Sequence, residues 1–162
     1  MAVDFILDVE SGLVDDPFDP GGLTKFGISQ RAYPGLNIRD LTIDDAKAIY
    51  RQDYWNLCSC DKLPAGVGLV VFDAAVNQGV GASLRMLQSA LKVREDGVAG
   101  PATISAVRAQ AAPSIIAEMI ARRSVAYALS TLVSRDGLGW FRRLAKVHQL
   151  ALTAAPDQQQ RT

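Results

Sequence analysis

A glutamate and an aspartate near the N-terminus are the side chains in this sequence that could do chemistry together. Glu10 ends a short apolar stretch and directly precedes a segment rich in turn-forming residues. Partial burial there would raise the pKa of its carboxyl group, which could then donate a proton to a glycosidic oxygen at neutral pH. Asp19 follows within the turn-rich segment, and glycoside hydrolysis uses such a second carboxylate. Thr24 adds a hydroxyl that could position a water molecule.

The same residues also allow a purely structural interpretation. Asp15, Asp16 and Asp19 flank prolines and glycines, where aspartate often only caps a turn. A calcium loop is disfavoured, because the alternating ligands of an EF-hand are missing. Chemistry alone therefore leaves both interpretations of Glu10 and Asp19 open.

Composition disfavours several other classes of function. His148 is the only histidine, which excludes zinc hydrolases that bind their metal through two histidines. Basic and acidic residues number 17 each, which argues against nucleic acid as the main partner. No nucleophile elbow and no phosphate-binding loop is present, and we expect neither a metal nor a cofactor. A Cys–His amidase or peptidase that pairs His148 with Cys58 or Cys60 stays open as an alternative.

The hydrophobic pattern predicts a mainly α fold with a small β-hairpin or irregular loop at 13–27. Thr42 is a candidate N-cap, with Asp45 three residues later. Pro101 fits the first position of a helix that follows the turn at 96–101. Further segments with helical character are 3–10, 42–57, 67–77, 83–91, a longest helix from Pro113 that Asp136-Gly137 ends, and 138–152. The polar residues 156–162 are predicted to be a frayed tail.

The start of the chain shows no basic region and no cleavage site of a signal peptide. No apolar run approaches the roughly 20 residues of a membrane span. We therefore expect synthesis in the cytoplasm, no membrane span, and a requirement for another component if the substrate lies outside the inner membrane.

The stretch from Glu10 to Ser29 resembles the signature of glycoside hydrolase family 108. In that signature a Glu-Gly-Gly segment is followed by an aspartate and by Pro-Gly-Gly-x-Thr-x-x-Gly-Ile-Thr. Ser11 replaces the first glycine here and Ser29 the last threonine, and neither position carries the acid–base chemistry. The order of Glu10, Asp19 and Thr24 is also similar to the catalytic triad of phage-type lysozymes.

The resemblance continues through two further blocks. Tyr50-x-x-x-Tyr54-Trp55 matches an aromatic motif of the family, and Phe72-Asp73-x-x-Val76-Asn77-x-Gly79 matches the next block. Tyr54 and Trp55 could stack on sugar rings, although Trp55 could equally be core. Asn77 could bind an N-acetyl group or cap its helix, and Asp73 could contact substrate or be buried.

Later blocks resemble a peptidoglycan-binding-type half that usually accompanies the family. They are Leu87-Gln88-x-Ala90-Leu91, Asp96-Gly97-Val98-x-Gly100-Pro101-x-Thr103 and Gly139-Trp140-x-x-Arg143. The expected organisation is one compact domain over 1–162, with a catalytic-motif half at 1–71 and a peptidoglycan-binding-like helical half at 72–150.

The resemblance implies a lysozyme-like fold and N-acetylmuramidase activity, as in phage or prophage endolysins and toxin-secretion loci. It implies Glu10 as general acid, Asp19 and Thr24 as its catalytic partners, and Tyr54, Trp55, Asp73 and Asn77 as substrate-binding residues. The expected partners are peptidoglycan glycan strands and a holin or other export partner, with action in the periplasm or cell wall. We expect a monomer. A non-catalytic peptidoglycan-binding protein is the other alternative.

Overall fold

The computed structural model describes residues 13–14 and 22–155 of the chain. The predicted helix at 3–10 and the predicted tail at 156–162 lie outside these residues. The chain divides into two compact units, Met1–Asp53 and Tyr54–Thr162. The expected functional halves at 1–71 and 72–150 stay a prediction.

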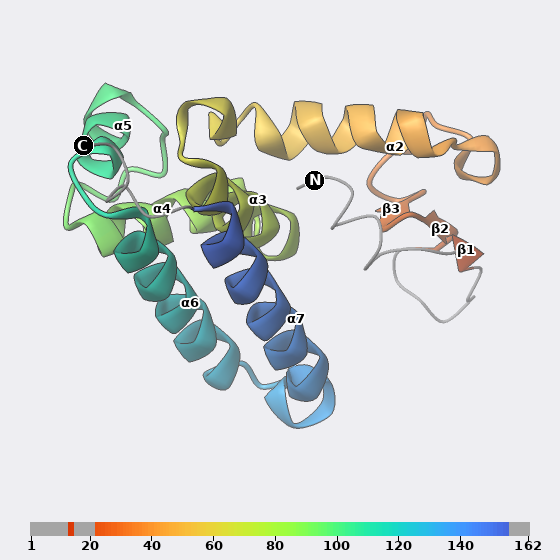
Figure 1. Ribbon diagram of the computed structural model, residues 1–162. Helices are drawn as coiled ribbons and strands as arrows, with labels where there is room; N and C mark the ends of the chain where they lie inside the picture. Colours follow the sequence, from red (N-terminus) through yellow and green to blue (C-terminus); the bar gives the residue numbers. More distant parts are fainter. Residues whose placement is uncertain (1–12, 15–21, 156–162) are drawn as a thin grey trace. The chain divides into compact units, whose positions relative to one another are not determined.

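The first unit contains a small antiparallel sheet and a capped helix. Strands β1 (Leu13–Val14), β2 (Thr24–Lys25) and β3 (Ile28–Ser29) are ordered β1-β2-β3, with Thr24 opposite Ser29. A 3₁₀ helix, η1 (Ile38–Asp40), then precedes α2 (Ile43–Tyr50) (Figure 1). The predicted hairpin is thus present and gains a third strand.

The start of α2 follows directly from two side chains. The Thr42 hydroxyl accepts a hydrogen bond from the backbone N–H of Asp45, and the Asp45 carboxylate accepts one from the backbone N–H of Thr42. This capping box satisfies two amide groups that an uncapped helix would leave without partners. The predicted N-cap at Thr42 is confirmed. The helix continues as a π-helical turn, η2 (Arg51–Trp55), close to the predicted end at Leu57.

The second unit is a helical bundle built around α3. Its elements are the 3₁₀ helix η3 (Cys60–Lys62), α3 (Ala65–Gln78), α4 (Val80–Leu91), α5 (Pro101–Arg108), α6 (Ala112–Ala128) and α7 (Val133–Ala154). Helix α3 contacts α4, α6 and α7, and the last two lie side by side (Figure 1). Val67, Val70, Val71 and Phe72 of α3 are almost completely buried. A helix that is apolar on all sides is stable only when neighbours surround it.

One helix boundary differs from the prediction. The break before the last helix lies at 129–132, and Asp136-Gly137 lies inside the first turns of α7, which is therefore the longest helix. The Asp136 carboxylate accepts two hydrogen bonds from the guanidinium group of Arg135. Its negative charge near a helix N-terminus also interacts favourably with the helix dipole. The pKa of Asp136 is lowered by these hydrogen bonds. An acidic residue at this place favours the start of a helix, and the single glycine after it does not end one.

No helix among the described residues is long and apolar enough to cross a membrane.

Candidate active site

Two of the three predicted catalytic residues, Glu10 and Asp19, lie outside the described residues. Thr24 lies on β2, the middle strand of the sheet. Its hydroxyl donates a hydrogen bond to the carbonyl oxygen of Gly22 at 3.0 Å. A threonine hydroxyl has one donor and two acceptor positions, so Thr24 can still accept a hydrogen bond from a water molecule. Thr24 can therefore bind a water molecule that donates a hydrogen bond to its hydroxyl oxygen.

A tight turn and a tyrosine hold the strand that carries Thr24. Phe26 and Gly27 link β2 to β3 with φ angles of 54° and 73°, the positive values of the two-residue turn that best joins hairpin strands. The hydroxyl of Tyr50, a buried residue at the end of α2, donates a hydrogen bond of 2.8 Å to the carbonyl oxygen of Phe26. Tyr50, the first residue of the aromatic motif, thus stabilises the turn of the hairpin. The sequence did not reveal this role.

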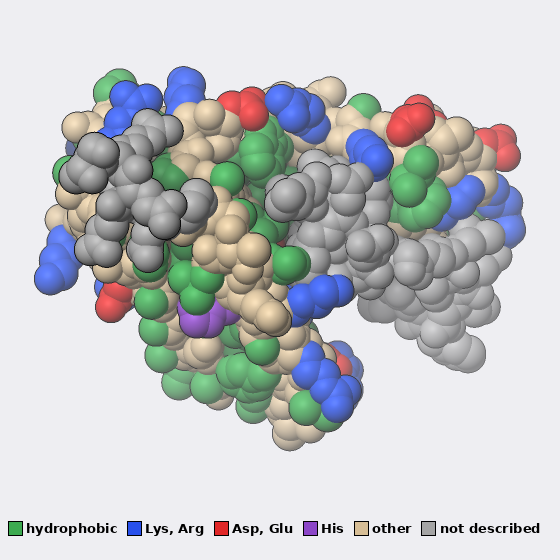
Figure 2. Space-filling model, in the orientation of Figure 1, with side chains coloured by type: hydrophobic (Ala, Val, Ile, Leu, Met, Phe, Trp, Pro, Cys, Tyr) green, Lys and Arg blue, Asp and Glu red, His purple; other side chains and the backbone are tan. Residues whose placement is uncertain are grey.

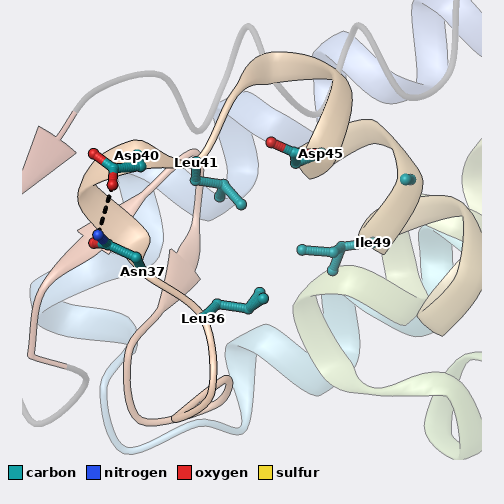
Figure 3. A pocket seen from close by; sticks show the side chains of 7 residues that line it. Leu36, Asn37, Asp40, Leu41, Asp45 and Ile49 are labelled. Atoms are coloured by element: carbon teal, nitrogen blue, oxygen red, sulfur yellow. Dashed lines mark hydrogen bonds between the residues drawn. The ribbon is translucent and has the colours of Figure 1, made fainter.

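The first unit also contains an open pocket of about 420 Å³ between η1 and α2. Figure 3 shows Leu36, Leu41 and Ile49 around the hollow, with Asn37 donating a 2.6 Å hydrogen bond to Asp40 on one side. Asp45 also lines the pocket, and its hydrogen bonds with Thr42 lower its pKa. A carboxyl group of lowered pKa is ionised at neutral pH and cannot serve as a general acid. Asp45 therefore offers no substitute for the chemistry assigned to Glu10.

In the second unit, Trp55 is held by two contacts. Its indole N–H donates a 2.9 Å hydrogen bond to Asp61, and its ring meets Phe72 edge to face at a centroid separation of 5.4 Å. The side chain is half-buried. These contacts support the core interpretation, while the exposed part of the ring remains accessible. Tyr54 is also half-buried, and its contact with substrate stays a prediction.

Asp73 is completely buried in the second unit, between α3, α6 and α7. Its carboxylate lies 2.7 Å from a guanidinium nitrogen of Arg123 and 2.8 Å from one of Arg143. Arg123 also donates hydrogen bonds to Gln78 at 3.1 Å and to the hydroxyl of Tyr127 at 3.2 Å. Both carboxylate oxygens face arginines, and the side chain has no exposed surface to offer a glycan. This geometry favours the structural interpretation of Asp73 over the predicted contact with substrate.

Asn77 lies one helical turn after Asp73, as its spacing predicted, but it is exposed. Its side-chain N–H₂ group donates a 2.7 Å hydrogen bond to the backbone carbonyl of Asp73. This bond uses the donor side of the amide and leaves its oxygen to accept a hydrogen bond from a ligand. Both interpretations of Asn77, helix capping and binding of an N-acetyl N–H, are compatible with this arrangement.

The cysteines are poorly arranged for nucleophilic catalysis. Cys58 and Cys60 are both buried, and their thiols hydrogen-bond to each other. That bond and burial raise the pKa of the Cys60 thiol. Within residues 22–155, His148 makes no hydrogen bond with either thiol. A Cys–His nucleophile needs the thiol and the imidazole in contact, so this geometry argues against that alternative. The described residues also hold no group of three or more histidine, cysteine, aspartate or glutamate side chains that could bind a metal ion.

The motif at 96–103 has a structural use that the sequence did not reveal. The buried Gln88 donates hydrogen bonds to Asp96 at 2.7 Å, to the carbonyl oxygen of Val98 at 3.0 Å and to Thr103 at 3.1 Å. Its own side-chain oxygen accepts the backbone N–H of Gly97. One glutamine of α4 therefore connects the turn at 96–98 with the first residues of α5.

Comparison with known proteins identifies the family. Residues 3–79 match the model of glycosyl hydrolase 108, a range that includes all seven predicted site residues. Among the solved structures that match, SagA of Brucella abortus is 36% identical, with 97% of this chain and 95% of that chain covered and a TM-score of 0.87. The chain belongs to the glycosyl hydrolase 108 family. No curated protein matches.

Family membership makes the protein a glycoside hydrolase, and at family level a peptidoglycan hydrolase. The whole-chain likeness to SagA confirms the predicted fold class, mainly α and lysozyme-like. The predicted phage or secretion context and the binding role of the C-terminal half stay predictions.

Proposed function

We propose that this glycosyl hydrolase 108 protein is an N-acetylmuramidase that cleaves the β-1,4 bond between N-acetylmuramic acid and N-acetylglucosamine. The observation that carries the proposal is the family match over 3–79, which spans Glu10, Asp19 and Thr24 in the order expected of the signature. The available acceptor of the Thr24 hydroxyl supports its part in holding water.

In the proposed reaction, Glu10 donates a proton to the leaving glycosidic oxygen. Asp19 stabilises the positive charge that develops on the sugar or, with Thr24, orients the attacking water. Tyr54, Trp55 and Asn77 are the proposed substrate contacts among the described residues. The glycan strands lie outside the inner membrane, so we also propose that a holin or another export partner releases the protein to the periplasm or cell wall.

Analysis of the products tests this proposal. Purified peptidoglycan is digested, and mass spectrometry of the fragments before and after borohydride reduction identifies the new ends. Hydrolysis predicts reducing N-acetylmuramic acid. Anhydro-muramic ends would indicate a lytic transglycosylase, and new free amino groups a peptidase. Because Cys58 and Cys60 are buried, substitution tests the cysteine alternative better than alkylation. Full activity of folded Cys58→Ala and Cys60→Ala variants would exclude it.

A matched pair of variants tests the acid. Glu10→Gln keeps the size of the side chain and removes its proton, so lysis should fall by about 10²–10⁴-fold in a folded protein. Glu95→Gln makes the same change at an exposed position, and its activity should equal that of the wild type. Near-normal activity of a folded Glu10→Gln protein would disprove the role of Glu10.

A further inference from the structure

A hollow in the second unit brings the side chains of one lysine and one arginine together, and no acidic residue of the described part of the chain lines it. It has a volume of about 300 Å³ and lies between the end of η3 and the first turns of α5. Lys62 lines one side, and Pro101, Ser105 and Arg108 line the other. The last three are four and seven residues apart along α5, a spacing that puts them on one face of the helix.

Among the described residues, no carboxylate neutralises the charges of this hollow. Lys62, Ser105 and Arg108 are exposed, and within residues 22–155 no carboxylate pairs with either cation. The neighbouring carboxylate of Asp61 accepts the indole N–H of Trp55. Lysine and arginine side chains also lie on the surface at the end of the second unit that carries α5 (Figure 2). Because the chain has no overall charge surplus, this local excess is not a consequence of composition.

The walls of the hollow combine an apolar surface with a few polar groups. Ile104 is 8% exposed and, with Pro101, provides an apolar surface beside the hydroxyl of Ser105. Gln88 fixes the turn that carries Gly100, through its bonds to Asp96 and Val98. A site of this size with a fixed apolar wall and a few converging polar groups suits a small ligand or the end of a larger one. Two cations and a hydroxyl select an oxyanion.

We propose that this hollow binds a free carboxylate of the peptide stems of peptidoglycan. The inference rests on the proposed function, which makes peptidoglycan the polymer that the protein meets. The carboxyl group of muramic acid is used up in the amide bond to the peptide stem, whereas the amino acids of the stem carry free carboxylates next to small apolar side chains. Such an end matches the charge of Lys62 and Arg108 and the apolar surface of Ile104 and Pro101. The hollow would hold the polymer by its stems while the glycan is cut elsewhere.

Sedimentation with insoluble peptidoglycan in the cold tests the proposal, with two ligands that differ only in charge. One is native peptidoglycan, and the other has its stem carboxylates converted to carboxamides by carbodiimide and ammonia. The wild-type protein should bind the amidated form about ten-fold more weakly, as loss of charge-assisted hydrogen bonds at an exposed site implies. Lys62→Gln/Arg108→Gln should bind native peptidoglycan as weakly as the wild type binds the amidated form, and should not distinguish the two.

A control variant has the same change of charge at another exposed place. Lys92→Gln/Arg94→Gln also replaces one lysine and one arginine, and it should bind like the wild type. Far-UV circular dichroism and thermal unfolding establish that both variants are folded. Equal loss of binding in both variants would mean a general effect of charge and would overturn the site.

The remaining outcomes separate this proposal from the proposed function. Unchanged binding by Lys62→Gln/Arg108→Gln, with normal production of reducing muramic ends, would disprove the stem site and leave the muramidase intact. Release of no muramic ends from native peptidoglycan by the wild type would disprove the proposed function. Tighter binding of the wild type to poly(glycerol phosphate) than to stem-bearing peptidoglycan would reassign the hollow to a phosphate polymer.

Discussion

Removal of a carboxylate that is buried against two guanidinium groups takes away a short ion-pair contact from each of them. We therefore expect Asp73→Ala to lower the free energy of unfolding by about 3–5 kcal/mol, the usual result when one partner of a buried ion pair is deleted. Urea unfolding followed by circular dichroism measures this change. Glu95→Ala, at an exposed position, should change it by less than about 0.5 kcal/mol.

The opposite outcome would restore the role expected from the sequence. If Asp73→Asn left the unfolding free energy unchanged and raised the KM for peptidoglycan many-fold, Asp73 would be a substrate contact. The sequence could place Asp73 and Asn77 on one helix face, because helical spacing is local. It could not identify Arg123 and Arg143 as partners, since Arg143 is 70 residues away along the chain and only the packing of three helices brings them together.

The same limit explains the aromatic motif. The sequence singled out Tyr50, Tyr54 and Trp55 as a group, but their individual roles depend on partners in other elements. Tyr50 reaches the turn at Phe26, 24 residues earlier, and Trp55 reaches Phe72. Residue type and spacing predicted that these positions matter, whereas the structure separates a tyrosine that fastens the hairpin from a tryptophan that packs on α3.

The junction between α3 and α4 depends on one glycine. Gly79 ends the first helix and begins the second with φ 89° and ψ 150°, a conformation that is essentially restricted to glycine. Gly79→Ala should therefore destabilise the protein by about 1–3 kcal/mol, although a Cβ atom there would meet nothing within 4 Å. Thermal unfolding monitored by circular dichroism measures the effect.

An identical substitution within a helix should act in the opposite direction. Gly139 lies in the interior of α7, and a Cβ atom there would also meet nothing within 4 Å. Gly139→Ala should stabilise the protein by up to about 1 kcal/mol, because alanine favours the helix and has less freedom in the unfolded chain. Destabilisation of equal size by both substitutions would show that backbone conformation is not the cause at Gly79.

Helix positions were predictable where local chemistry determines them. Thr42 with Asp45 begins α2, and Pro101 begins α5, because capping and proline act within one turn. The boundary at Asp136-Gly137 was wrong, because Asp136 favours a helix start and the glycine after it is tolerated within α7. A dipeptide that often ends helices therefore lies within one. Whether Asp-Gly ends a helix or lies in its first turns depends on where that helix begins.

For the whole molecule, the fold class followed from helical periodicity and from the resemblance, and the likeness to SagA confirms it. Helical periodicity could not provide the arrangement of the bundle. Residues 66–72 of α3 are all apolar or glycine and all buried, so their pattern indicates burial but does not say which helices cover them. The hollow beside α5 was equally hidden, because Lys62 and Arg108 are 46 positions apart and neither belongs to a recognised motif.

The stereochemistry of the reaction depends on how far the fold separates Glu10 and Asp19. A water between the second carboxylate and the sugar requires the carboxyl groups to be ~6.5–9.5 Å apart and gives inversion, whereas a covalent route needs ~5–5.5 Å. Thr24 favours the water route, because its hydroxyl donates to Gly22 and can still accept a hydrogen bond from water. We therefore predict inversion, with the α-anomer as the first product detected by NMR.

This mechanism also predicts how the two carboxylates differ in their effects. If water is the nucleophile, Asp19→Ala should leave a residual rate and lower activity less than Glu10→Gln, because water can still attack without its base. In a covalent mechanism, loss of Asp19 would remove the nucleophile itself. Early appearance of the β-anomer, or a glycosyl–Asp19 adduct trapped with a fluorinated substrate and found by mass spectrometry, would establish retention. Either result would overturn the inverting mechanism and leave the muramidase assignment intact, because both routes cleave the same bond.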